Sequence, residues 1–191
     1  MGTTWLFARA RRSIGTAVIA VVALGAACGG WAGYLRITGN IHEIEPGVFR
    51  SAQLGADKLV ALIDEHHIKT VLNLRGNDPG EGWYDAEAKA VHDAGARYVS
   101  IGLSDSHEPD PATLAKLVDA LKTAPKPLLL HCAAGADRAG LASAIYEFLV
   151  MHRPPAVADE QLSFRYGHFP WLISRTGAMD RTFERVVSET N

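Results

Sequence analysis

The segment from His131 to Gly140 carries the residues best suited to chemistry. It reads His-Cys-Ala-Ala-Gly-Ala-Asp-Arg-Ala-Gly and joins a strand-like apolar run to a periodic helical one. A loop of small residues between a strand and a helix N-terminus turns backbone N–H groups inward, which favours a bound oxyanion such as phosphate. The same field favours the ionised, nucleophilic form of Cys132, and Arg138 can grip two oxygens through its planar guanidinium. The segment therefore indicates a nucleophilic cysteine in an anion-binding loop.

The segments around this loop alternate between strand-like and helical patterns. Short apolar runs at 70–74, 97–102 and 127–131 are expected to form strands. Asp110 followed by Pro111 is typical of an N-cap and first helical turn. Helices are expected from residue 111, around 59–63, and at 83–94, 141–149, 158–166 and 178–188. The alternation predicts an α/β fold whose central, mostly parallel sheet is flanked by helices, entered through a short junction at 37–45.

The N-terminal part predicts a membrane segment. Residues 14–34 form an uncharged run of 21 residues, which would span about 31 Å as a helix, enough to cross a bilayer. The expected division is a cytoplasmic tail at 1–13, a transmembrane helix at 14–34 and a catalytic domain at 35–191.

Charges near this segment predict its orientation. Arg9, Arg11 and Arg12 precede the apolar run, whereas Arg36 alone closely follows it. The positive-inside rule then places the domain on the periplasmic, extracytoplasmic side. A cleaved signal peptide is the alternative, because small residues at 25–27 suit a cleavage site.

Composition excludes several classes of protein. The 191 residues suit one globular domain, with 48% hydrophobic residues to build a core. Lysine and arginine number 19 against 21 acidic residues, so no cationic field exists to hold a nucleic acid, and none is expected as a partner. Cys28 and Cys132 are the two cysteines, which excludes a framework of disulfides.

The loop, with His-Cys, five residues and Arg, resembles the signature of cysteine-dependent phosphatases, most closely the bacterial dual-specificity-like tyrosine phosphatases. The segments GVFRSAQ at 47–53, VLNLR at 71–75 and LSFRYGH at 162–168 are also similar to segments of that family. The resemblance extends over roughly residues 44 to 170. It implies the fold of the cysteine phosphatases, following one transmembrane helix.

The resemblance implies phosphomonoester hydrolysis through a cysteinyl-phosphate on Cys132, without a metal or a cofactor. The expected substrate is a phosphorylated protein, first of all on tyrosine, because the loop lacks the lysines that phosphoinositide-acting relatives tend to carry. A membrane lipid or another small phosphomonoester is the alternative substrate. The residues expected to bind phosphate are Ala133, Ala134, Gly135, Ala136, Asp137 and Arg138.

The family supplies a proton to the leaving group from an aspartate, and Asp105 occupies the matching place. Asp137 is an alternative acid, while Glu108 matches less well and Asp110 is expected to cap a helix. His131 is expected to order the loop and Arg75 to support substrate binding. Arg50, like Arg75, is expected either to contact substrate or to form a structural ion pair.

Ala139 departs from the family, in which a serine or threonine hydroxyl normally donates to the nucleophilic sulfur. Its absence removes a hydrogen bond to a charged group, worth about 1.5 to 3 kcal/mol. This departure motivates a hypothesis of another class, a module that binds phosphate without hydrolysing it.

Overall fold

A computed structural model describes residues 3–171 and 174–190, with side chains from Val18 onward. The chain divides into two compact units, Met1–Ile37 and Thr38–Asn191. Helix α1 (Thr3–Thr38) contains a stretch, Val18–Thr38, whose 21 residues are long and apolar enough to cross a membrane. The predicted segment 14–34 overlaps this stretch. Residues 1 and 2 of the predicted tail, and the side chains of Arg9, Arg11 and Arg12, lie outside the described part.

The second unit is built on a five-stranded sheet with the order β1-β2-β5-β3-β4. β1 pairs antiparallel with β2, and the remaining neighbours are parallel, so the prediction of a mostly parallel sheet is confirmed. β5 lies at the centre, between β2 and β3. The strands are β1 (His42–Glu45), β2 (Val48–Ser51), β3 (Thr70–Asn73), β4 (Arg97–Ser100) and β5 (Leu128–His131).

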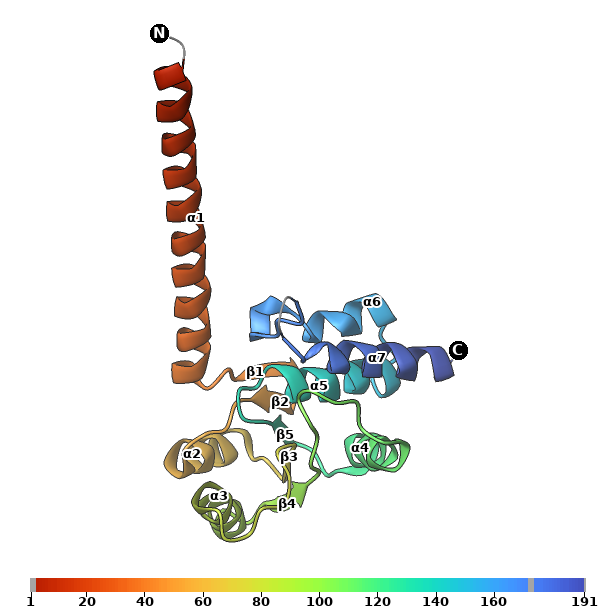
Figure 1. Ribbon diagram of the computed structural model, residues 1–191. Helices are drawn as coiled ribbons and strands as arrows, with labels where there is room; N and C mark the ends of the chain where they lie inside the picture. The colour runs from red at the N-terminus through yellow and green to blue at the C-terminus, as the bar shows by residue number, and fades with distance from the viewer. Residues whose placement is uncertain (1–2, 172–173, 191) are drawn as a thin grey trace. The chain divides into compact units, whose positions relative to one another are not determined.

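Helices cover both faces of this sheet, as Figure 1 shows. α2 (Ala56–His66) and α3 (Gly82–Asp93) pack on one face. α4 (Pro111–Thr123), α5 (Asp137–Leu149) and α7 (Gly177–Thr190) form the core on the other face. Alternation along each strand explains this division, because successive side chains point to opposite faces. In β5, Leu129 faces α2, whereas Leu128 and Leu130 face α4 and α5.

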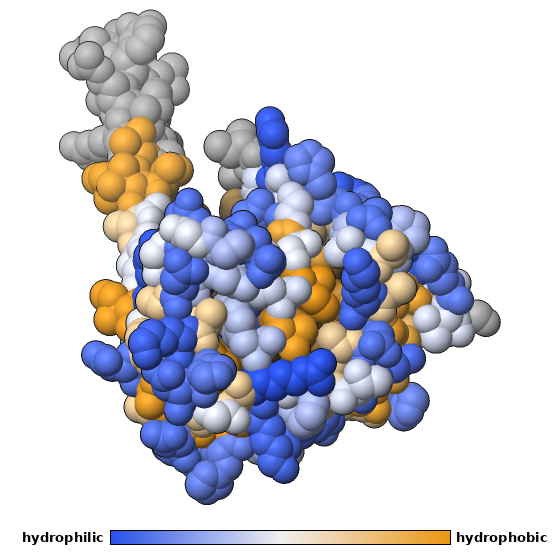
Figure 2. Space-filling model, turned by 90° about the horizontal axis from the view of Figure 1, so that it is seen from below, coloured by the Kyte–Doolittle hydropathy of each residue, from blue (hydrophilic) through white to orange (hydrophobic). Residues whose placement is uncertain are grey.

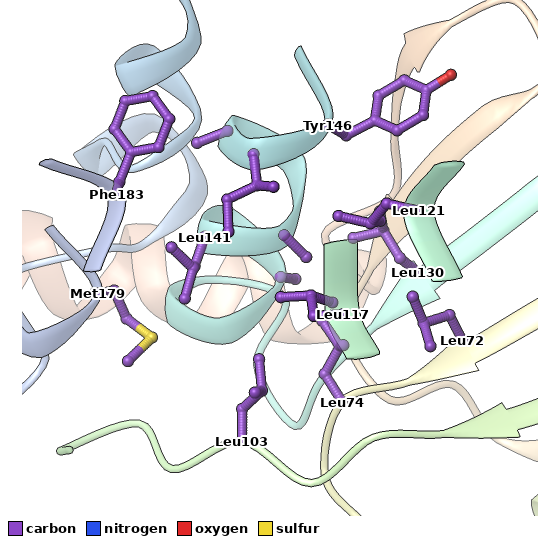
Figure 3. Packing of buried hydrophobic residues seen from close by; sticks show 14 of the residues in the cluster. Leu72, Leu74, Leu103, Leu117, Leu121, Leu130, Leu141, Tyr146, Met179 and Phe183 are labelled. Carbon is purple, nitrogen blue, oxygen red and sulfur yellow. The ribbon is translucent and has the colours of Figure 1, made fainter. Parts of the chain in front are cut away.

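The larger core lies between the sheet and α4, α5 and α7. In Figure 3, Leu141 of α5 lies among side chains from α4, α7 and the strand ends. Leu117 and Leu141 are fully buried, and Met179 and Phe183 of α7 close the cluster on the far side of α5. This packing fixes α5, whose first turn follows the cysteine loop, against the end of the central strand.

The edge strand β4 borders a hollow of about 260 Å³ beside α4. Arg97 and Lys116 line this hollow together with Val99 and Ile101. The space-filling view of Figure 2 shows mostly hydrophilic residues on the face seen from below, with hydrophobic ones near its centre. Charged side chains at an edge strand oppose its pairing with another sheet.

Two expectations about local structure are wrong. The junction at 37–45 contains a strand, β1, because Gly47, with φ +83°, closes a tight turn that pairs it with β2. The helix expected at 158–166 breaks into α6 (Pro155–Ala158) and two short 3₁₀ helices, η1 (Asp159–Gln161) and η2 (Phe164–Tyr166). Its helical hydrogen bonds are interrupted because the carbonyl of Gln161 accepts from the side chain of Arg50.

Candidate active site

Cys132 lies directly after the central strand, at the carboxyl edge of the sheet. His131, which ends β5, is in register with Ser51 of β2 and with Asn73 of β3. Ligands of open α/β sheets bind at this edge, outside the carboxyl ends of the strands. The Cys132 side chain is buried, with 2% of its surface exposed, and it forms no disulfide.

The carbonyl groups of residues 133–136, in the loop after Cys132, all accept hydrogen bonds from residues outside the loop. The N–H of Gln53 donates to Ala133 O at 3.4 Å, and Asn40 Nδ2 donates to Ala134 O at 3.0 Å. The Arg50 guanidinium donates from Nη2 to the carbonyl oxygens of residues 135 and 136 at 2.8 and 3.2 Å. A planar trans peptide directs its N–H opposite to its C=O, so the N–H groups that follow these carbonyls point the other way.

These N–H groups are available to an anion. They belong to residues 134–137, and none of them donates to a backbone or side-chain acceptor within the described residues. Ala136, the N-cap of α5, offers no side chain to cap its first turn. Free amides and the positive end of a helix dipole together make an oxyanion site.

Gly135 has a conformation that only glycine adopts easily. Its φ is +69°, and a Cβ there would lie 2.6 Å from Ala52 N and 2.7 Å from Ser51 C. The end of β2 therefore presses directly against the loop, and this contact sets the curvature of the loop.

Arg138 and Asp105 lie close together. Arg138 Nη2 is 4.0 Å from Asp105 Oδ2, and its Nη1 donates to Leu103 O at 3.4 Å. Asp105 is exposed, whereas Arg138 is largely buried and its Nε has no hydrogen-bond partner in the described part of the chain. The predicted acid loop thus reaches the anion-binding loop.

The other candidate acids on that side of the sheet have structural partners. Glu108 pairs with Arg181 at 2.9 Å and with Arg185 at 3.5 Å. Asp110 caps α4 as predicted, accepting from Thr113 N at 2.9 Å, and hydrogen bonds from Thr113 lower its pKa. These contacts hold both carboxylates on other partners, and neither contact involves the loop after Cys132.

Asp137 belongs to a buried charge cluster that the sequence does not reveal. Its Oδ1 lies 2.7 Å from His168 Nδ1, and His168 Nε2 lies 3.0 Å from Asp180 Oδ2. Burial lowers the pKa of His168, but hydrogen bonds to both aspartates outweigh burial and raise it to about 9. At neutral pH a charged histidine therefore joins the first turn of α5 to α7, and Asp137 is engaged in structure.

His131 lies beside a buried carboxylate. Its Nε2 is 3.0 Å from Glu87 Oε1 of α3, at an angle that does not make a hydrogen bond. Tyr98 Oη donates to the same oxygen at 2.6 Å, and the other Glu87 oxygen accepts from Gln53 Nε2. Burial and the hydrogen bond to Glu87 both raise the pKa of Tyr98.

Arg75 joins this network from the surface. Its Nη1 donates to Gln53 Oε1 at 2.9 Å, and its guanidinium lies over the Trp83 ring at 3.5 Å. Arg50 is fully buried and bonds to neutral oxygens. Among the described side chains, neither arginine forms an ion pair, so that part of the expectation is wrong.

Several residues that shape the site were not found from the sequence. Glu87 had a signal, because it shares the buried face of α3 with Ala90 and Val91 at helical spacing. Asn40 and His168 had none, since their partners lie 94 and 31 residues away. No group of three or more His, Cys, Asp or Glu side chains that could hold a metal occurs in the described ranges.

Comparisons with solved structures show the fold. The crystal structure of TpbA from P. aeruginosa superposes with a TM-score of 0.58 at 22% identity, covering 81% of this chain and 92% of that chain. A putative phosphatase from Shewanella putrefaciens gives 0.59 at 20% identity, with 81% and 96% covered. PTPMT1 in complex with PI(5)P gives 0.56 at 19% identity, with 79% and 99% covered.

Sequence comparisons show the family. No curated protein matches the chain. A family model described as a Swiss Army Knife protein, DSP-PTPase phosphatase domain, matches residues 40–176, which include the loop, the acid segment and the Asp137–His168 pair. The chain therefore belongs to this PTP-SAK family of phosphatase domains, within the dual-specificity and tyrosine phosphatases.

Proposed function

We propose that the chain hydrolyses phosphomonoesters through a cysteinyl-phosphate on Cys132, with phosphotyrosine in proteins as its preferred substrate. One observation carries the proposal: the four carbonyls of residues 133–136 accept hydrogen bonds from Gln53, Asn40 and Arg50, which leaves the amides that follow them free for an anion beside a buried cysteine. Such preorganised donors are the main source of catalysis in phosphoryl transfer.

In the proposed first step, Cys132 Sγ attacks phosphorus and the bond to the leaving oxygen breaks. Asp105 protonates that oxygen, and its position 4.0 Å from Arg138 supports this role. In the second step water attacks phosphorus of the cysteinyl-phosphate while Asp105 takes a proton from the water. The S–P bond breaks, the Cys132 thiolate is restored, and inorganic phosphate leaves. Arg138 and the loop amides stabilise the charge on the equatorial oxygens. His131 orders the loop, and Arg75 supports the substrate through its contact with Gln53.

Phosphotyrosine is preferred because the loop offers little charge for a headgroup with several phosphates. Residues 133, 134 and 136 are alanines, and Asp137 is paired with His168. TpbA has been crystallised with phosphotyrosine, whereas PTPMT1 has been crystallised with PI(5)P. A membrane lipid is the second candidate substrate, favoured by the apolar stretch Val18–Thr38.

We propose in addition that α1 anchors the chain and that the phosphatase domain faces the extracytoplasmic side. The apolar stretch and the arginines at 9, 11 and 12 support this orientation. Protease is added to sealed, right-side-out vesicles from expressing cells. It should remove a domain on the extracytoplasmic side and leave a cytoplasmic domain intact.

Phosphate release by the full chain in lipid nanodiscs tests the function. Substrates are a phosphotyrosine peptide, a phosphoserine peptide and a phosphatidylinositol phosphate, each also assayed with Cys132→Ser. We expect release from the phosphotyrosine peptide at the highest kcat/KM and none from Cys132→Ser. Preference for the lipid would favour the second candidate. No release above the Cys132→Ser control with any substrate would leave a phosphate-binding module.

A further inference from the structure

We propose that Arg50 is a positioning residue of the phosphate loop, and that its buried charge replaces the hydroxyl missing at residue 139 in keeping Cys132 ionised. This inference rests on the proposed function, since it explains how that loop holds a thiolate.

The geometry of Arg50 is that of a two-sided clamp. Nη2 donates to Gly135 O at 2.8 Å and to Ala136 O at 3.2 Å. Nη1 donates to both oxygens of Gln161, the carbonyl at 2.9 Å and the side-chain amide at 2.6 Å. One rigid guanidinium therefore binds the loop through its carbonyls and is itself held by Gln161, after α6. These contacts fix the orientation of the loop peptides, and with it the direction of their amides.

Arg50 also carries a charge without a matching carboxylate. The side chain is completely buried, its hydrogen bonds go to neutral oxygens, and its guanidinium lies 4.0 Å from the centre of the Tyr166 ring. Its Nε has no hydrogen-bond partner in the described parts of the chain. The buried carboxylate of Glu147 reaches Arg50 only through Gln161, whose Nε2 donates to it at 2.9 Å. A buried charge without a directly paired counter-ion is costly, so a further anion nearby is favoured.

Cys132 begins the loop whose carbonyls Arg50 binds, and it is one of the neighbours whose negative charge stabilises protonated Arg50. Burial lowers the pKa of Arg50 to about 10, and the neighbouring Tyr166, Cys132, Glu147 and Asp137 partly oppose this effect. Arg50 therefore keeps its proton at neutral pH, and its buried positive charge lies against the loop that begins at Cys132. Ala139 is fully buried at the start of α5 and brings no hydroxyl to the sulfur.

Two glycines, Gly135 in the loop and Gly140 in the first turn of α5, make room for this arrangement. A Cβ on Gly135 would collide with the backbone at the end of β2, the strand that carries Arg50. A Cβ on Gly140 would lie 2.9 Å from Gln161 O and 3.5 Å from Arg50 Nη2. Both glycines are needed at the sites where Arg50 and its second anchor approach the loop.

The experiment measures the ionisation of Cys132 without requiring turnover. The full chain is used in detergent micelles with Cys28→Ser, so that iodoacetamide alkylates Cys132 alone, and the rate is followed from pH 4 to 9. We expect Arg50→Gln to lower the rate at pH 6 about tenfold, because less of the thiol is ionised. Arg50→Lys keeps the charge but not the planar fork, and should restore part of that rate. Arg97→Gln, at an exposed arginine on β4, is the matched control and should follow the wild-type profile.

Two further variants separate charge from shape. Asn40→Ala removes a neutral donor to the loop and should weaken vanadate binding while leaving the alkylation profile in place. In the wild type, Ala139→Ser should change the alkylation rate at pH 6 by less than about twofold. Added to Arg50→Gln, the same substitution should restore the alkylation rate that Arg50→Gln loses.

Three results would overturn the inference. One is a wild-type profile for Arg50→Gln, and another is an Arg50→Lys profile as poor as that of Arg50→Gln. The third is a gain of about tenfold from Ala139→Ser alone, which remains measurable if the Arg50 variants do not fold. A wild type that ionises as expected but releases no phosphate would instead refute the proposed function alone.

Discussion

Replacement of His168 by glutamine should make the stability of the protein lose much of its dependence on pH. His168 is fully buried between Asp137 and Asp180, and the two carboxylates raise its pKa from the ordinary 6.5 to about 9. A group whose pKa is raised by folding stabilises the folded state below its unfolded pKa. This contribution is complete below about pH 6.5 and disappears as the pH rises through 9.

The size of the effect follows from the two pKa values. Each pH unit between them corresponds to about 1.4 kcal/mol, so protonated His168 contributes about 3 kcal/mol at pH 6, about 2 kcal/mol at pH 7.5 and almost nothing at pH 9.5. For a chain of this size, 3 kcal/mol corresponds to a fall in Tm of roughly 6 to 12 °C. Glutamine keeps one donor for the aspartates, so the loss at high pH should be small.

Thermal unfolding of the full chain in micelles, followed by near-UV circular dichroism at pH 6, 7.5 and 9.5, measures this difference. His92→Gln is the matched control, because the His92 side chain is 90% exposed. Equal Tm values for wild type and His168→Gln at pH 6, or a gap that widens toward pH 9.5, would refute the assignment of a charged histidine to this cluster.

Three other substitutions test the site and its supports. Gly135→Ala should cost about 1 to 2 kcal/mol for the left-handed backbone, and more for the collision with β2, so vanadate affinity measured by calorimetry should fall; unchanged affinity in a folded variant would contradict the close packing of the loop. Asp105→Asn should reduce kcat for alkyl phosphates by about 10² to 10⁴ while vanadate affinity is retained, and an intact fall in rate on the alkaline side of its pH–rate profile would assign the proton to another group. Asp110→Ala removes the cap of α4 and should cost about 1 kcal/mol, seen as a lower Tm with normal turnover; a normal Tm would show that the cap is not needed.

The parts of the fold that local patterns determine were predicted well. The cysteine loop occupies one continuous segment between β5 and α5, so residue types and spacing were sufficient to find it. The cap at Asp110 and the apolar face of α2 also depend on neighbours within one or two turns. β1 reads HEIE, with a single apolar residue, so it lacks the apolar run that identified the equally short β3 and β5.

Long-range contacts account for what was missed. The helix expected at 158–166 breaks because Arg50, 111 residues earlier, takes the carbonyl of Gln161. From the sequence, Arg50 was expected to contact substrate or to form an ion pair. Its hydrogen bonds to the loop carbonyls and to Gln161 were not predicted. The role of His168 was not found from the sequence, because its two aspartates are brought to it by α5 and α7. No periodicity encodes such partners, since tertiary packing alone brings them together.

Asn40 has a practical consequence for anyone who shortens this protein. Its side-chain amide donates to Ala134 O and also to Tyr166 O at 2.8 Å, and it stands two residues after the end of α1 at Thr38. A truncated form that starts after Asn40 would lose a hydrogen bond to the loop that follows Cys132, together with the apolar stretch of α1. Low turnover of such a form would then result from the loss of the Asn40 hydrogen bonds. A truncated form that retains Asn40 has to be compared with the full chain before any dependence of activity on lipid is inferred.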